Sequence, residues 1–289
     1  MSMNLEHNSA LASTGDTAGK TYVLRYLPNF IVGFNSASVL LNSSAAVLGA
    51  FHYDEASNAT RPFVVIMHLP FDVNKHSVYL TIVLLQFSYL LILSAGAATV
   101  NSVLIILVLH LGGQIDVICK FLTELPQGKN DQMANVTVLK EIIKKHQRAI
   151  TFSENIESLY TYIALVLGLI NTLVTCGLGF ILVISVGSPN FTKMIIKNLT
   201  FYCVLNIETL VLCFAGEYLT AKSKEIGDAA YNSPWYQSKF HGRIVLFIIM
   251  RSQKQLTITM GKFMDLSLEQ FANIVKASAS YMSVLLAVY

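Results

Sequence analysis

Long runs of apolar residues constrain this chain more than any other feature of its sequence. A membrane helix needs roughly 20 apolar residues to cross about 30 Å of hydrocarbon. Hydrophobic residues make up 54% of the 289 and charged residues only 13%, too few for the surface of a soluble domain. The sequence therefore predicts an all-α, polytopic membrane protein in a lipid bilayer. About five transmembrane helices are expected, near residues 27–50, 79–111, 157–187, 198–218 and 267–289.

Basic residues are unevenly divided among the segments that join these windows. The segments 51–78 and 188–197 contain two lysines or arginines each, whereas 112–155 contains six and 219–262 contains seven. Segments rich in lysine and arginine stay in the cytoplasm. The sequence therefore predicts a plasma-membrane protein with a cytoplasmic N-terminus and an extracellular C-terminus, which is the reverse of a G-protein-coupled receptor.

Two glycosylation sequons fall in the predicted outer segments, at Asn58 and Asn190. Both asparagines are candidate glycosylation sites, although such tripeptides also arise by chance. Residues 1–26 are polar and lack the basic-then-apolar pattern of a cleaved signal peptide, so the first apolar run is expected to serve as an uncleaved signal after this cytoplasmic segment.

Several classes of function find no support in the sequence. The formal net charge of +3 is modest and forms no basic tract or aromatic-interleaved face, which argues against nucleic acid as a partner. The four cysteines are unclustered, the histidines are scattered without metal-ligand spacing, and no nucleophile motif stands out. We therefore expect no enzyme activity, metal site or cofactor.

The inner segment 219–262 contains one apolar run, residues 244–250, which is far too short to span a bilayer and must be buried in protein. Pro234 interrupts the chain before it, and Tyr231 and Trp235 offer aromatic surface. This surface fits either packing within one subunit or contact with a second subunit. Residues 137–156 show mainly helical spacing of apolar residues, which indicates a cytoplasmic extension of a membrane helix, a calmodulin target or a membrane-surface helix.

The last helix is expected to follow a short extended link at residues 257–260. Ser267 and Gln270 form a capping box that places a helix start there. From Ser267 to the end of the chain, a helix rises about 34 Å, enough to cross the membrane once.

One face of this last helix is polar, and charged or polar groups are costly in hydrocarbon. Val284 and Val288 continue the face toward the outer end. Such a face fits either a wet vestibule that ends in a hydrophobic gate and is shared by several subunits, or a polar seam inside one subunit. The predicted pore-lining residues, at spacings of three and four, are Asn273, Lys276, Ser280 and Ser283.

The C-terminal third contains four distinctive stretches, which are Ala229-Ala-Tyr-Asn-Ser-Pro-Trp-Tyr236, Ile248-Ile-Met-Arg-Ser-Gln-Lys-Gln-Leu-Thr-Ile-Thr-Met-Gly-Lys-Phe263, Leu266-Ser-Leu-Glu-Gln-Phe271 and Ser280-Tyr281. Together they resemble the C-terminal signature of insect odorant receptors. Leu69-Pro-Phe-Asp72 resembles the segment before that family's fourth span, and Cys213-Phe-Ala-Gly-Glu217 resembles the end of its sixth. The resemblance covers the chain from about Leu27 to its end.

The resemblance implies a subunit of a ligand-gated, nonselective cation channel that detects volatile small molecules in olfactory neurons. Four subunits would share a pore lined by the last helix, with Val284 and Val288 as the gate and with Tyr231 and Trp235 in a cytoplasmic anchor. The inner segment 112–155 lacks the long insertion typical of the family's co-receptor. The resemblance therefore implies a ligand-tuning subunit that forms a hetero-tetramer with that co-receptor.

The resemblance also implies an apolar pocket in the outer half of the membrane helices, suited to volatile hydrophobic ligands. The chain would then divide into a cytoplasmic segment (1–26), membrane helices with the ligand-binding region (27–218), a cytoplasmic anchor region (219–262) and a pore helix (263–289). The five windows match the family's third to seventh spans, so an N-terminally truncated receptor form is expected. Candidate pocket residues are Phe34, Tyr79, Tyr89 and Phe201.

Two alternative functions remain open at this point. A transporter of small apolar molecules is expected to carry inverted repeats or broken spans, and no convincing repeat is found. A truncated receptor form without channel function is the other alternative, because the missing spans would help to form the pocket.

Overall fold

The computed structural model describes residues 26, 29–44, 46–48, 51, 63–64, 76–124, 132–184, 191–237 and 239–288. The chain divides into two compact units, and each is described by itself. Unit 1 contains residues 1–103 and 181–205, and unit 2 contains residues 104–180 and 206–289. Both are predominantly helical where the structure describes them, which confirms the predicted all-α membrane architecture.

Three long helices correspond to three of the predicted spans. They are α2 (His76–Thr123), α3 (Gln132–Ile184) and α4 (Phe191–Tyr231). Within the described residues, these three helices are long and apolar enough to cross a membrane. Each is at least 41 residues long, about twice the length that a bilayer requires.

The excess length of these helices extends them into the inner segments between the predicted spans. α2 continues to Thr123 and α3 begins at Gln132, so most of 112–155 is helix rather than loop. The predicted helical extension at 137–156 is therefore confirmed. α4 likewise continues to Tyr231, because residues 219–231 contain no proline and only one glycine to interrupt the backbone hydrogen bonds. Pro234 follows directly, where the helix has ended.

The first and last predicted spans are also helical where they are described. Residues 29–44 and 46–48 are helical, and α6 covers Leu268–Val288. Unit 1 has a small apolar core in which Tyr79 and Val83 of α2 pack with Ala46 and Val64. The ring of Phe63 meets that of Tyr79 edge to face at 5.3 Å between centroids.

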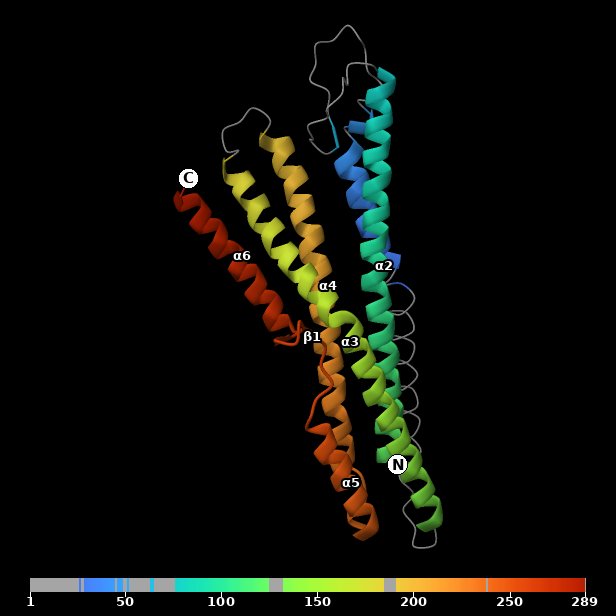
Figure 1. Cartoon of the computed structure of the whole chain (residues 1–289). Helices are drawn as coiled ribbons and strands as arrows, with labels where there is room; N and C mark the ends of the chain where they lie inside the picture. The colour runs from blue at the N-terminus through green and yellow to red at the C-terminus, as the bar shows by residue number, and fades with distance from the viewer. Residues whose placement is uncertain are drawn as a thin grey trace, which may run out of the picture. The chain divides into compact units, whose positions relative to one another are not determined.

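Unit 2 continues after α4 with a short 3-10 helix, η2 (Trp235–Gln237), and helix α5 (Lys239–Ser252). A link then leads to α6 through two short antiparallel strands, β1 (Thr259–Met260) and β2 (Met264–Asp265). Thr259 pairs with Asp265, and Met260 pairs with Met264. Figure 1 follows the chain from α5 through this link into α6.

Candidate pore face and the link that positions it

The start of α6 is fixed by side chains from two elements. The Ser267 hydroxyl accepts a hydrogen bond from the Gln270 amide at 3.2 Å, which confirms the predicted cap. The carboxylate of Glu217 on α4 accepts a hydrogen bond from the Leu268 amide at 3.4 Å. Both bonds satisfy amides that have no partner within the helix, and a carboxylate is favourable at the positive end of the helix dipole. The first turn of α6 is therefore tied to α4.

The link before α6 is held against α3. The Thr259 hydroxyl donates to the Glu157 carboxylate at 2.9 Å and lies 3.0 Å from the Thr161 hydroxyl. The Gly261 amide donates to the Thr161 carbonyl at 3.0 Å. Because a backbone bond accompanies the side-chain bonds, α3 fixes both the position and the orientation of the turn between β1 and β2.

Two glycines, one in the link and one on α4 beside it, allow this arrangement. Gly261 has a φ of +62°, in the left-handed region that glycine adopts without strain, and Lys262 follows at +64°. On α4, a side chain at Gly216 would collide with the carbonyl oxygen of Leu266. Glycine at position 216 thus allows α4 to contact the backbone of the link directly.

α6 has a packed face and an exposed face. Ser278 is buried at 4% exposure, and Ile274 and Met282 on the same face are half-buried, with the Met282 sulfur packed at Gly179 of α3. The predicted pore-lining residues Asn273, Lys276, Ser280 and Ser283 are all exposed in the chain taken alone. At about 100° per residue, the mean directions of the two sets are roughly 180° apart. The polar residues therefore lie on the face that α6 does not use to pack within this subunit.

The two predicted gate residues are at the far end of α6. Val284 lies on the exposed face, with 58% of its surface accessible. Val288 is the last residue of the helix, and its side chain lies outside the described part of the structure. Val284 thus shares the exposed face with the polar residues.

The predicted anchor residues come together after the end of α4. The Trp235 indole donates to the Tyr231 carbonyl at 3.0 Å, and the Trp235 ring contacts that of Tyr236. On α5, Val245 and Ile248 are buried. Phe247, with 71% of its surface accessible, is among the exposed apolar side chains of the same helix, which also include Leu246 and Met250. Of the two possibilities that the sequence left open for the run 244–250, packing of the whole run within one subunit does not hold, because Leu246, Phe247 and Met250 are exposed on the side of α5 that its own chain leaves uncovered.

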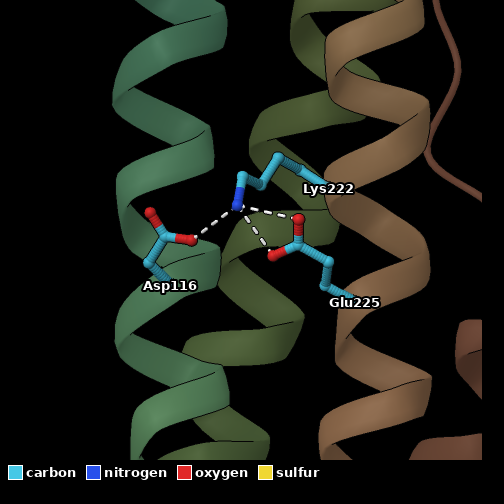
Figure 2. A network of polar contacts seen from close by, with 3 residues as sticks. All are labelled: Asp116, Lys222 and Glu225. Atoms are coloured by element: carbon cyan, nitrogen blue, oxygen red, sulfur yellow. Dashed lines mark hydrogen bonds and ion pairs between the residues drawn. The ribbon is translucent and has the colours of Figure 1, made fainter. Parts of the chain in front are cut away.

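A network of three charged groups joins α2 and α4 in unit 2 (Figure 2). The Lys222 ammonium lies 3.0 Å from the Asp116 carboxylate and 2.7 Å from that of Glu225. At the next residue of α4, the Ser223 hydroxyl accepts a hydrogen bond from the Leu256 amide at 3.2 Å. This network was not predicted from the sequence. Its only signal was the position of Asp116 and Lys222, a few residues past the ends of two apolar windows.

The four candidate ligand residues lie in unit 1 and differ in environment. Tyr79 has no accessible surface and belongs to the packed apolar core of that unit. Phe34 is half-buried and stacks with Phe30, whereas Tyr89 and Phe201 are exposed. The candidate glycosylation sites Asn58 and Asn190 lie outside the described residues.

Comparison with known proteins adds a family assignment to this geometry. The family model for 7tm odorant receptors matches residues 18–279. Odorant receptor 67c of Drosophila melanogaster is 25% identical over 235 residues, which cover 79% of this chain and 56% of that protein. Odorant receptor Or2 of Anopheles gambiae is 31% identical over 153 residues, which cover 52% of this chain and 39% of that protein. The chain thus spans about half the length of the curated relatives that it matches.

The solved structures of one insect olfactory receptor have the same fold. Receptor OR5 of Machilis hrabei in complex with eugenol superimposes with a TM-score of 0.76 at 16% sequence identity, covering 96% of this chain and 70% of that one. A second structure of OR5 gives a TM-score of 0.70 with the same coverage. At this identity, the likeness establishes the helical architecture alone.

Proposed function

Because this chain belongs to the 7tm odorant receptor family, we propose that it is a ligand-tuning subunit of an odorant-gated, nonselective cation channel. Olfactory reception is the function of the family, and its members are receptors rather than enzymes. What we propose beyond the family is the channel activity, the co-receptor as partner and the class of ligand. A single observation carries the proposal: the polar stripe of α6 lies opposite the face by which α6 packs against its own subunit.

The exposed stripe needs an environment other than hydrocarbon. Lys276 is charged and exposed, and a lysine that faces lipid near the middle of a membrane helix is costly. Water on an axis shared by several subunits solvates Lys276 and the serines, and Val284 and Val288 narrow that path into a hydrophobic gate. A polar seam inside this subunit is disfavoured, since the residues that pack are those on the other side of α6.

The apolar surface of α5 supports assembly into a tetramer with the odorant co-receptor. Leu246, Phe247 and Met250 are exposed in the chain taken alone, and so are the aromatic residues Tyr231 and Tyr236 that precede α5. Large apolar side chains at an interface gain stability by leaving water, and aromatic residues are enriched there. We assign residues 219–262 to a cytoplasmic anchor, with 1–26 also cytoplasmic, 27–218 as the membrane and ligand-binding region and 263–289 as the pore helix.

In this proposal, the ligand is a volatile hydrophobic molecule that binds in the outer half of the membrane helices. Phe34, Tyr89 and Phe201 are the side chains proposed to contact it, since each retains accessible surface. Tyr79, the fourth candidate, has no accessible surface and packs in the apolar core of unit 1. The receptor lies in the plasma membrane with its C-terminus outside, and Asn58 and Asn190 are proposed glycosylation sites there.

Co-expression with the co-receptor in a voltage-clamped cell tests the proposed function. We expect an odorant-evoked cation current, and we expect Val284→Lys combined with Val288→Lys to reduce it about tenfold, because positive charge in a narrow path repels cations. Leu268→Lys is the matched control at the inner, exposed start of α6. An unchanged current in the double variant, at equal surface expression, contradicts the pore assignment.

A further inference from the structure

The outer half of α6 meets α3 where Met282 packs onto Gly179. A methyl group at position 179 would collide with the Met282 sulfur and would lie 3.3 Å from its Cγ. In Figure 1, α6 rises beside the second half of α3, which contains this glycine. Because Gly179 has no side chain, Met282 reaches the backbone of α3. The size of these two residues therefore determines how closely α6 approaches α3 at this level.

α3 is held in place by α4 close to this contact. The Asn171 side-chain amide donates to the Thr209 hydroxyl of α4, and the Thr175 hydroxyl donates to the Asn171 side-chain oxygen at 3.1 Å. All three residues are buried, and in a membrane such bonds between helices resist separation. Thr175 lies one helical turn from Gly179. A steric push between Gly179 and Met282 therefore moves α6 rather than α3.

α6 can yield to such a push because it is tied at its opposite end. The Leu268 amide is bonded to Glu217, and Met282 lies 14 residues further along, about 21 Å from that tie. Val284 follows Met282 by two residues, so its side chain points about 200° further round the helix, nearly opposite to Met282. Movement of α6 away from α3 therefore carries Val284 in the direction in which its exposed side chain points.

We propose that the contact between Gly179 and Met282 is a steric stop that sets the distance of the Val284 gate from the pore axis. The inference rests on the proposed function, in which Val284 points toward that axis. A larger residue at 179 pushes Val284 inward and favours the closed channel. A smaller residue at 282 lets α6 settle toward α3 and favours the open channel. Gly179 and Met282 are positioning residues, since they lie on the packed side of α6 and act on the gate through it.

Odorant dose–response curves of the full chain with the co-receptor test the proposal by the sign of the change. Gly179→Ala should raise the odorant concentration for half-maximal current about fivefold, the low end for overpacking because methionine is flexible. Met282→Ala should lower that concentration about fivefold and raise the current without odorant. The two changes combined should restore it to within about twofold, since the new methyl group then has no side chain to strike. Loss of stability alone gives neither opposite shifts nor compensation.

Gly177→Ala is the matched control on the same helix. A methyl group there meets no atom within 4 Å, and the gain in helix propensity equals that of Gly179→Ala, so we expect a change below about twofold. If Gly179→Ala fails to reach the cell surface, Met282→Ala is compared with the double variant, which should reverse its shift.

Three results at equal surface expression each overturn the inference alone. They are shifts of the two single variants in the same direction, a double variant in which the shifts do not cancel, and an effect of Gly177→Ala as large as that of Gly179→Ala. A chain that conducts no odorant-evoked current with the co-receptor instead overturns the proposed function, and this inference with it.

Discussion

Lys222 illustrates how one side chain can hold the inner ends of two helices together. It is 16% exposed and lies between carboxylates from α2 and α4. Without the ammonium, Asp116 and Glu225 would face each other as two like charges. An exposed ion pair contributes little to the stability of the fold, whereas loss of one partner of a buried pair destabilises it strongly. The effect of a partly buried pair such as this one lies between these two limits.

Replacement of Lys222 by methionine is therefore expected to destabilise unit 2 by about 1–3 kcal/mol, since the two carboxylates lose their partner while the volume of the side chain is kept. Thermal unfolding of the detergent-solubilised chain measures the effect. Lys224→Met is the matched control on the same helix, because Lys224 is exposed. Equal melting temperatures for the two variants would show that the network contributes no stability.

Among the helices and links, the connection between α5 and α6 has the clearest mechanical role. It is bonded to α3 through Thr259 and Gly261, and the first residue of α6, Leu268, is bonded to Glu217 of α4. Long helices transmit displacement because their internal hydrogen bonds keep them rigid. A shift of α3 or α4 on ligand binding would therefore move the first turn of α6 with it.

Loss of the Thr259 hydroxyl should weaken this coupling. We expect Thr259→Val to lower stability by about 1–2 kcal/mol, since Glu157 loses a hydrogen bond in a partly buried place. The odorant concentration for half-maximal current should rise at unchanged surface expression. Thr257→Val serves as the comparison, because Thr257 lies in the same link but makes none of these bonds. If both variants respond alike to odorant, the Thr259 contacts play no part in coupling.

The link also indicates which parts of the molecule the sequence could predict. Alternation at 257–260 and the Ser267–Gln270 spacing are local signals, and both the extended link and the helix start are confirmed. The contacts of Thr259 with Glu157, about a hundred residues away, have no local signal. The spans were predictable because apolar length is set by the bilayer. The helical extension at 137–156 was predictable from its apolar spacing, whereas the continuation of α2 to Thr123 was obscured by the charged residues Asp116 and Lys120.

For the assembled receptor, the uncovered side of α5 is the feature that the single chain leaves unexplained. Phe247 is 71% exposed, so its contribution to the fold of one subunit is small. Phe247→Glu should therefore leave monomer stability unchanged within about 0.5 kcal/mol. In the proposed tetramer with the co-receptor, the same change should reduce the assembled fraction about tenfold or more, because it would place a charge in an apolar interface.

Size-exclusion chromatography of co-expressed subunits measures that fraction. Phe263→Glu provides the control, since Phe263 is an equally exposed aromatic residue outside α5. A tetramer fraction that falls equally in both variants would argue against a specific role for the α5 surface.

Cysteine accessibility along α6 tests the pore face most directly. Ser280→Cys and Ser283→Cys place a thiol on the exposed face, whereas Ser278→Cys places one on the packed face, where Ser278 is hydrogen-bonded to the Ile274 carbonyl. A charged, water-soluble thiol reagent applied during odorant-evoked current should block channels with cysteine at 280 or 283 and leave those with cysteine at 278 unaffected. If the thiols at 280 and 283 resist the reagent with the channel open and closed alike, α6 does not line a pore.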